Sequence, residues 1–329
     1  MDRIRIISRN NGAGLSRDLK LMKEVLAETS DAEVETVGFG TAKTANWWRM
    51  TRLAAGVLVN SRADTQVFAE RVYRGCLPLA RRNVLVPNPE WFLPKWLAHL
   101  PKFDMILCKT HHAQRIFGRL GCNTRYIGFT SEDRYQPEVP RQRAFFHLAG
   151  HSFTKGTQVL LDTWGRHPEW PLLTVVQNKT DTQRLADNID HRVGHMDDAS
   201  LRHLQNSHLF HICPSEAEGF GHYLMEGLSV GAVVIATDGE PMNELVTPNH
   251  GLLIAPARSG TRSLSPCYYV DAQGIEAAVA QALLLSPQEC ERIGYAARTF
   301  FVRNDRSFRV RLPSVLVDDA YRTGAGYRA

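Results

Sequence analysis

Two glutamates, Glu218 and Glu226, are separated by seven residues, and the positions from Glu218 to Gly221 form a glycine-rich turn. Residues 208–214 precede this turn with the pattern of a short buried strand, and residues 223–229 follow it with the pattern of a helix. The N–H groups at a helix start attract anions, and carboxylates accept hydrogen bonds from hydroxyl groups. This combination predicts a site for a sugar nucleotide, with its diphosphate on the amides near Gly221.

The flanking elements indicate where such a site would lie in a fold. Gly231 ends the predicted helix and a strand follows at residues 233–237, so the order is strand, turn, helix, strand. Open α/β sheets bind ligands outside the carboxyl ends of their strands, where this turn would lie. If the helix begins at Gly221, His222 and Glu226 share one face. Alternatively, both glutamates occupy a solvated helix start, which acidic residues also favour.

A lysine-glycine pair, Lys155-Gly156, lies upstream of the two glutamates. It follows a predicted strand that ends at Gly150 and precedes an apolar helix over residues 159–164. A strand rich in β-branched residues, 172–176, lies between this pair and the glutamates. The order along the chain is thus a strand, this lysine-glycine pair, a helix and a second strand, followed by the turn with the two glutamates.

These motifs, in this order, resemble those of the family-4 nucleotide-sugar glycosyltransferases of the GT-B fold. The resemblance implies that Lys155 holds the diphosphate, Glu218 the sugar hydroxyls and Glu226 the ribose hydroxyls. The other donor-binding positions that it implies are His151, Gly194, His195, Gly219, Phe220, Gly221, His222 and Tyr223. The family usually has arginine where this chain has His151, a weaker and pH-dependent donor. Transfer with retention, from a UDP- or GDP-linked sugar, is expected from the same resemblance.

Strands and helices also alternate through the first half of the chain, which predicts an α/β protein with parallel sheets. The resemblance implies two Rossmann-like domains whose sheets face each other across a cleft. We expect an acceptor-side domain over residues 1–140 and a nucleotide-sugar-binding domain over residues 141–305. Residues 306–329 are expected to cross back to the first domain, and closure of the domains would exclude water.

Polar residues follow two predicted strands of the first half. Asn88 and Glu90 come after residues 84–86, and Lys109 and His111 come after residues 105–108. We expect Asn88, Glu90 and Lys109 to face the acceptor. His111, or else His112, is expected to act in catalysis through a hydrogen bond to the transferred sugar, and Glu90 is an alternative group that orients the acceptor hydroxyl. The alternative is that Thr110 caps a helix whose first turn holds the histidines.

A glycine turn near the start of the chain is a weaker candidate. Gly12 and Gly14 precede a predicted helix and could bring the backbone close to the donor phosphate. An ordinary strand-to-helix turn explains the same two glycines.

We expect no metal and no other cofactor. The chain has no Asp-x-Asp triplet, and the histidine pairs His147/His151 and His191/His195 are not clearly on helices, so a zinc site is not predicted. The cationic work then falls to Lys155 and the helix amides, which would stabilise the departing nucleoside diphosphate.

The charge of the chain is unevenly distributed. The net charge is +5 overall, of which residues 1–144 carry +9 and the rest −4. A basic acceptor-side domain favours an anionic acceptor, such as membrane phospholipid, lipopolysaccharide or nucleic acid. Scattered arginines retained for solubility are the alternative. The run Trp47-Trp48-Arg49 suits a membrane interface or stacking on nucleic acid, or else a helix that packs Trp47 and Leu53 into the core.

Location and function follow from these observations as expectations. The chain has no apolar run near the roughly 20 residues that cross a bilayer. The charged start and the six scattered cysteines suit the cytoplasm, with peripheral attachment to the inner membrane face. Three functions stay open: a glycosyltransferase acting on an envelope glycan or lipid, one acting on hydroxymethylated bases in DNA, and a non-catalytic protein that binds nucleotide sugars or glycans.

Overall fold

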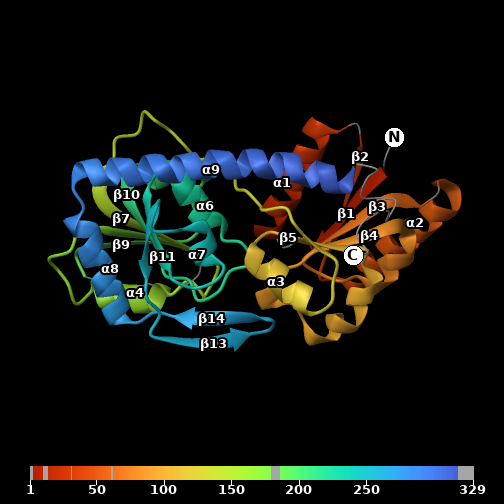
Figure 1. The fold of residues 1–329 in the computed structure, drawn as a ribbon, viewed down its shortest axis with the longest axis horizontal. Coiled ribbons are helices and arrows are strands. Elements are labelled where there is room, and N and C mark those ends of the chain that lie inside the picture. The colour runs from red at the N-terminus through yellow and green to blue at the C-terminus, as the bar shows by residue number, and fades with distance from the viewer. Residues whose placement is uncertain (1–2, 10–13, 31, 61, 179–185, 318–329) are drawn as a thin grey trace, which may run out of the picture. The chain divides into compact units, whose positions relative to one another are not determined.

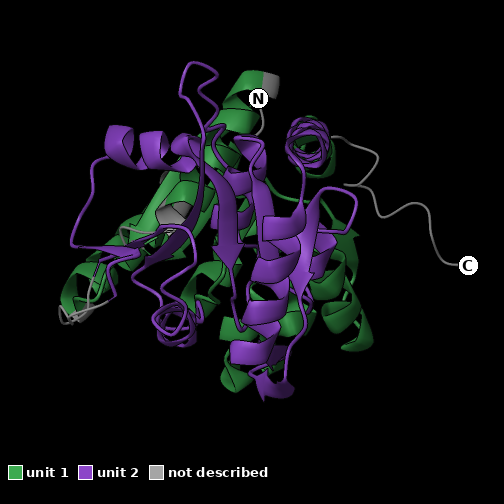
Figure 2. Cartoon of the chain, turned by 90° about the vertical axis from the view of Figure 1, so that its left-hand side faces the viewer, with its two compact units in different colours: residues 1–130, 305–329 green, residues 131–304 purple. Residues whose placement is uncertain are grey.

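The computed structural model describes residues 3–9, 14–30, 32–60, 62–178 and 186–317. Strands and helices alternate along these residues from β1 to α9 (Figure 1). The chain divides into two compact units (Figure 2). Unit 1 comprises residues 1–130 and 305–329, and unit 2 comprises residues 131–304.

Unit 1 is built on a parallel sheet with the strand order β2-β1-β3-β4-β5-β6. Its strands are β1 Arg3–Arg9, β2 Glu33–Phe39, β3 Ala63–Ala69, β4 Ala80–Val86, β5 Met105–Cys108 and β6 Thr124–Tyr126. Its helices include α1 Gly14–Thr29, α2 Lys43–Asn60 and α3 His111–Arg119, with 3-10 turns η1 Arg74–Leu79, η2 Pro89–Trp91 and η3 Pro94–Lys102. The carboxyl-terminal halves of the central strands are buried and apolar, as in residues 67–69 of β3 and 84–86 of β4.

Unit 2 is built on a parallel sheet with the strand order β12-β11-β10-β7-β8-β9. Its strands are β7 Gln142–Gly150, β8 Leu173–Gln177, β9 Ile189–Val193, β10 His208–Cys213, β11 Val233–Thr237 and β12 Gly251–Ile254. Its helices are α4 Thr157–Trp164, α5 Asp198–Ser207, α6 His222–Ser229, α7 Met242–Leu245, α8 Ala272–Leu284 and the first part of α9 Pro287–Leu316.

Helices cover both faces of the unit 2 sheet. On one face, α4, α8 and the start of α9 pack on the strands through a core that includes Trp164, Phe210 and Ile293 (Figure 1). On the other face, Leu201 and Leu204 of α5 contact a smaller apolar cluster. The sheet is thereby held rigidly, and its strand ends provide fixed points for the loops that follow them.

Two features add to these layers. An antiparallel hairpin, β13 Arg258–Arg262 and β14 Ser265–Tyr269, follows β12. Helix α9 continues from unit 2 into unit 1. Within unit 1, the Phe308 ring lies 4.8 Å from the Phe129 ring, and Arg309 pairs with Glu28 at 2.7 Å. These contacts tie the last helix to the unit 1 core.

The predicted fold class is confirmed. Both sheets are parallel, and the crossovers between their strands are mostly helical. The alternation of buried strands and amphipathic helices in the sequence was sufficient to predict this class because parallel strands need long, usually helical crossovers.

Candidate active site

The direction in which the unit 2 sheet is built reverses between β7 and β10. From β7 the chain adds β8 and β9 on one side of the sheet, and from β10 it adds β11 and β12 on the other. The loops that follow two such neighbouring strands diverge, which leaves a crevice where α/β proteins bind ligands. Lys155 lies in the loop after β7, and Glu218 lies in the loop after β10.

A glycine brings these two loops together. Gly156 has a φ of 64°, and a Cβ atom built on it would lie 2.3 Å from the carbonyl oxygen of Pro214. Only glycine allows both this left-handed conformation and this close approach of two backbones. The backbone N–H of Glu216 donates to the carbonyl of Thr154 at 2.9 Å and joins the loops beside that contact.

Replacement of Gly156 by alanine is therefore expected to lower the free energy of unfolding by about 3 kcal/mol, because left-handed strain adds to the collision with Pro214. Gly150 provides the matched control, since its φ is 56° but a Cβ there meets no atom within 4 Å. Gly150→Ala should cost only about 1 kcal/mol. Urea unfolding of both variants measures the difference, and equal losses would contradict the close approach.

Lys155 and Glu218 form an ion pair across the two loops. The Lys155 Nζ lies 2.5 Å from Glu218 Oε1, and the side chains are 14% and 13% exposed. The same ammonium lies 3.5 Å from the centre of the Tyr223 ring. The sequence-predicted phosphate ligand and sugar ligand are thus in direct contact, in a partly buried position where charge interactions are stronger than in water.

Ser215 and Tyr223 support the carboxylate of this pair. The Ser215 hydroxyl donates to Glu218 Oε1 at 2.6 Å and lies 2.5 Å from the Tyr223 hydroxyl. Burial, and next the charge of Glu218, raises the pKa of Tyr223 well above its usual value, so the phenol stays protonated. Ser215 was not predicted as a site residue, although it lies only three residues before Glu218 in the same turn.

Helix α6 begins at the glycine turn beside this pair. Gly221 has a φ of 97° and is the N-cap, with its carbonyl accepting from the N–H groups of Leu224 and Met225. The helix dipole is positive at this end, which favours an anion there. The turn, the helix start and the Lys155 ammonium therefore lie together, as the sequence motif predicts for a diphosphate site.

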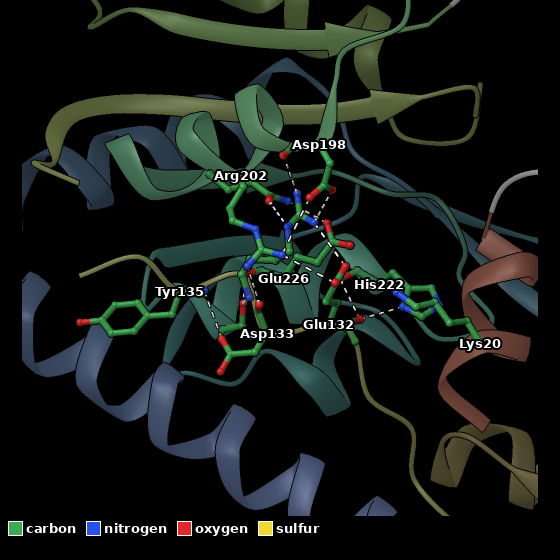
Figure 3. Close-up of polar contacts among 12 residues, drawn as sticks. Lys20, Glu132, Asp133, Tyr135, Asp198, Arg202, His222 and Glu226 are labelled. Carbon is green, nitrogen blue, oxygen red and sulfur yellow. Dashed lines mark hydrogen bonds and ion pairs between the residues drawn. The ribbon is translucent and has the colours of Figure 1, made fainter. Parts of the chain in front are cut away.

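Glu226 lies one turn further along α6 and is only 2% exposed. Its Oε2 accepts a hydrogen bond of 2.7 Å from the side-chain amide of Gln205. The side-chain oxygen of Gln205, Oε1, in turn accepts a hydrogen bond of 2.8 Å from the guanidinium of Arg134. Figure 3 shows Glu226 within this polar network, which also contains Asp198 and His222. The carboxylate predicted to bind ribose is thus held by a chain of buried polar groups.

Arg134, which anchors this chain, is itself 1% exposed. Its guanidinium pairs with Asp198 at 2.6 Å, and its backbone accepts a hydrogen bond from Asn206 at 2.8 Å. Neither Arg134 nor Gln205 was identified from the sequence. A signal existed for Gln205, because it follows Leu201 at helical spacing and so occupies the apolar stripe of α5.

His222 is the first residue of α6, and the predicted donor residues His151, Gly194 and His195 lie in nearby loops of unit 2. The Nδ1 of His222 lies 2.7 Å from the hydroxyl of Ser131. His151, after β7, contacts the side-chain amide of Asn178 at 2.8 Å, and Gly194, after β9, donates to the carbonyl of Gln177 at 3.0 Å. These residues and His195 therefore lie at the carboxyl ends of β7, β8 and β9, along the same edge of the sheet as Lys155.

Two buried histidines pack beneath this edge without charge. His147 bridges the Ile212 carbonyl and the Thr157 hydroxyl, and burial lowers the pKa of this histidine to about 4. His211 contacts the Gln205 carbonyl, and burial lowers the pKa of this histidine to about 3. Both are neutral structural groups in the folded protein.

These depressed pKa values predict that the protein loses stability as the pH falls below 6.5. The unfolded histidines take up protons near their ordinary pKa, whereas the folded ones do so only near pH 4 and 3, so the stabilisation is complete at neutral pH. At pH 5 the loss should be about 2 kcal/mol for each histidine. Urea unfolding at pH 7.5 and pH 5 measures it, and His211→Asn should reduce the loss by the contribution of His211, about 2 kcal/mol.

The acceptor-side residues predicted from the sequence belong to unit 1. Lys109 is buried and forms an ion pair with Asp18 and a hydrogen bond of 3.1 Å to Asn88 Oδ1. Glu90 is 5% exposed, in η2. The sequence analysis missed Asp18, although it precedes the buried Met22 by one helical turn and so lies on the apolar face of α1.

His111 lies in the first turn of α3, with its ring stacked 3.8 Å from that of Tyr126. Thr110 accepts a hydrogen bond from the Ala113 N–H at 3.1 Å, so the alternative prediction that Thr110 caps this helix is confirmed. Gly14 begins α1, whereas Gly12 lies outside the described residues.

Within the described part of the chain, no three His, Cys, Asp or Glu side chains are grouped as a metal site would require. The helices described there include none with the length and apolar character needed to span a bilayer.

Comparisons with known proteins relate this arrangement to a family. Residues 142–300 match the model of the family described as glycosyl transferases group 1. A search of curated proteins gives no significant match.

Solved structures share the fold at low sequence identity. A sucrose-phosphate synthase from Thermosynechococcus elongatus has a TM-score of 0.75 at 14% identity, covering 96% of this chain and 98% of that one. HepE from Anabaena, in complex with UDP and glucose, has a TM-score of 0.71 at 13% identity, with 96% and 99% covered. WaaG, a glycosyltransferase involved in lipopolysaccharide biosynthesis, has a TM-score of 0.64 at 14% identity, with 96% and 100% covered. Residues 142–300 thus form a glycosyl transferases group 1 domain, and the chain is a glycosyltransferase of the GT-B fold.

Proposed function

We propose that this glycosyltransferase moves a hexosyl group from a UDP- or GDP-linked sugar to an acceptor hydroxyl, with retention at the anomeric carbon and without a metal ion. The observation that carries the proposal is the Lys155–Glu218 pair of 2.5 Å beside the start of α6. Beside the start of this helix, the pair brings together a cation for the diphosphate and a carboxylate for the sugar, although the two residues are 63 positions apart in the sequence. The Anabaena HepE structure, which holds UDP and glucose, supports the donor class.

Each group has a distinct task in this reaction. The bond between the anomeric carbon and the diphosphate oxygen breaks, the acceptor oxygen bonds to the same face of that carbon, and the acceptor's proton passes to the departing diphosphate. Negative charge develops on this leaving group, where Lys155 and the α6 amides stabilise it. Glu218 accepts hydrogen bonds from sugar hydroxyls, because a carboxylate has lone pairs beyond those used by Lys155 and Ser215. Glu226 accepts hydrogen bonds from the ribose hydroxyls, and the hydrogen bonds from Arg134 through Gln205 orient its carboxylate.

The remaining predicted residues support substrate binding. His151, Gly194 and His195 bind the nucleotide at the carboxyl ends of β7 to β9. In unit 1, His111 hydrogen-bonds the transferred sugar, and Asn88, Glu90 and Lys109 bind the acceptor.

We further propose that the acceptor is an anionic or membrane-associated envelope glycan or lipid, reached from the cytoplasmic side of the membrane. The charge of +9 on residues 1–144 supports an anionic acceptor surface, because a basic surface concentrates anionic partners. WaaG, whose fold is similar, is a glycosyltransferase involved in lipopolysaccharide biosynthesis.

A two-stage experiment tests the proposal. Thermal unfolding in the presence of a panel of nucleotide sugars should identify the donor, since a ligand that binds only the folded state raises the melting temperature. The donor so identified, offered with envelope glycans and lipids, should release nucleoside diphosphate in the presence of EDTA, and NMR of the product should show the anomeric configuration of the donor. Binding without transfer, activity that returns only with added metal, an inverted product, or transfer to hydroxymethylated DNA alone would each contradict one part.

A further inference from the structure

Helix α2 of unit 1 presents two neighbouring tryptophans to solvent. Trp47 is 60% exposed and Trp48 is 68% exposed, and their rings meet edge to face with centroids 5.0 Å apart. The prediction of a core position is confirmed for Leu53, which is 9% exposed, but is wrong for Trp47. Exposure of large aromatic rings to water is unfavourable because it hydrates much apolar surface. An exposed pair of tryptophans therefore indicates a binding surface that a partner covers.

The opposite side of α2 explains why these rings point outward. Leu53 is buried, the Met50 sulfur lies 3.2 Å from the Cys76 sulfur of η1, and Asn46 bonds the backbone of Gly40. The helix therefore packs on the rest of unit 1 through one side, next to η1. Trp48 and the exposed Arg52 and Ala55 follow each other at helical spacing on the side that remains, with Trp47 beside them. We call these four residues the α2 tryptophan face.

Basic residues lie on and next to the α2 tryptophan face, and the sequence around α2 contains no acidic residue. Arg49 and Arg52 are exposed. No aspartate or glutamate occurs between Glu35 and Asp64 in the sequence, whereas four lysines and arginines do. The partner that complements exposed indole rings next to uncompensated cations has an apolar layer beneath an anionic one.

We propose that the α2 tryptophan face docks on a membrane surface that contains anionic lipid. Tryptophan is enriched at the boundary between head groups and acyl chains, where its ring is apolar and its N–H is hydrated. Basic side chains next to the rings are attracted by the negative surface potential of anionic lipids. Such a helix lies in the interface and does not cross it. The proposal deepens the membrane-associated acceptor proposed above, yet docking itself does not depend on sugar transfer.

The ring geometry favours lipid over nucleic acid. Stacking on single-stranded nucleic acid uses aromatic faces on which successive bases lie. Here the two rings stand at 77° to each other, so that the edge of one meets the face of the other. Ala54, Ala55 and Gly56, which are exposed on the same helix, offer no hydrogen bonds to bases but fit an acyl boundary.

Sedimentation with vesicles tests the proposal on the full chain without any sugar donor. Wild-type protein should sediment with phosphatidylcholine vesicles that contain phosphatidylglycerol and only weakly with phosphatidylcholine alone. The double variant Trp47→Ala/Trp48→Ala should bind the anionic vesicles at least about tenfold more weakly than the wild type. The double variant Arg49→Gln/Arg52→Gln should show a similar loss, and added salt should cause the same loss in the wild type. Trp91→Ala is the matched control, because Trp91 is 44% exposed elsewhere in unit 1 and should leave binding unchanged.

Several outcomes would overturn the proposal. They are wild-type protein that does not sediment with anionic vesicles, a double tryptophan variant that sediments as the wild type does, duplex or single-stranded DNA that binds in place of vesicles, and a dimer that dissociates when the tryptophans are replaced. Because both tryptophans are exposed, their replacement should not unfold the chain, and thermal unfolding verifies this. Transfer activity on a soluble acceptor should be unaffected by the double variant, so failure of docking and failure of the proposed reaction are separate results.

Discussion

Replacement of Lys155 by alanine is expected to lower kcat about a hundredfold to a thousandfold, because the charge that develops on the departing diphosphate loses its side-chain cation. The ammonium lies 2.5 Å from Glu218 at the switch point of the unit 2 sheet, and its side chain is 14% exposed, so water replaces it poorly. Turnover is measured as release of nucleoside diphosphate at saturating donor.

The control for this substitution is Lys102→Ala, which removes an exposed lysine of unit 1 and should leave kcat unchanged. Ser215 still donates to Glu218 in the Lys155→Ala protein, so the carboxylate keeps one partner and the fold should persist. A variant that stays folded, as judged by thermal unfolding, and turns over at the wild-type rate would remove Lys155 from the site.

Replacement of Glu226 by glutamine is expected to raise KM for the donor about tenfold and to change kcat little. Hydrogen bonds to a charged acceptor are stronger than those to a neutral one by about 1 to 2 kcal/mol, and the ribose remains distant from the bond that breaks. Glutamine preserves the volume of this 2% exposed side chain, so the packing of α6 is retained. Initial rates over a range of donor concentrations separate KM from kcat.

Two variants show whether the polar chain behind Glu226 orients it. Gln205→Ala removes the 2.7 Å hydrogen bond to Glu226 while leaving its charge, and should also raise the donor KM. Glu169→Gln changes an exposed carboxylate of the same unit and should have no effect. If Glu226→Gln left KM unchanged, or lowered kcat as strongly as Lys155→Ala, the assignment of Glu226 to the ribose would be wrong.

The sequence allowed the fold class and the main motifs to be predicted because their signals are local. Glycine turns, apolar strands and helix starts are set by neighbouring residues, so the turn from Glu218 to Gly221 could be located from the residues themselves. The role of Lys155 was expected from the resemblance to the glycosyltransferase family. The contact between Lys155 and Glu218 joins residues 63 positions apart. It could be expected only because both turns follow strands that a parallel sheet places side by side.

The parts that could not be predicted depend on partners distant in the sequence. Arg134 lies 71 residues from Gln205, and Lys109 lies 91 residues from Asp18. An isolated arginine or aspartate in a sequence is expected at the surface, and only the tertiary structure reveals that each is buried with a partner. For Trp47 the error was the reverse, because burial was predicted and the side chain is exposed. Hydrophobicity alone predicts burial and cannot indicate which side of α2 packs on the rest of unit 1.

Calorimetric titration with nucleoside diphosphate alone tests most directly whether Lys155 and the start of α6 form a diphosphate site, because this experiment needs neither the sugar nor the acceptor. The wild-type chain should bind UDP or GDP at one site, and Lys155→Ala should bind the same nucleotide at least about tenfold more weakly, since one charge-assisted contact to phosphate is lost. An unchanged dissociation constant in folded Lys155→Ala protein would contradict a diphosphate site at the start of α6.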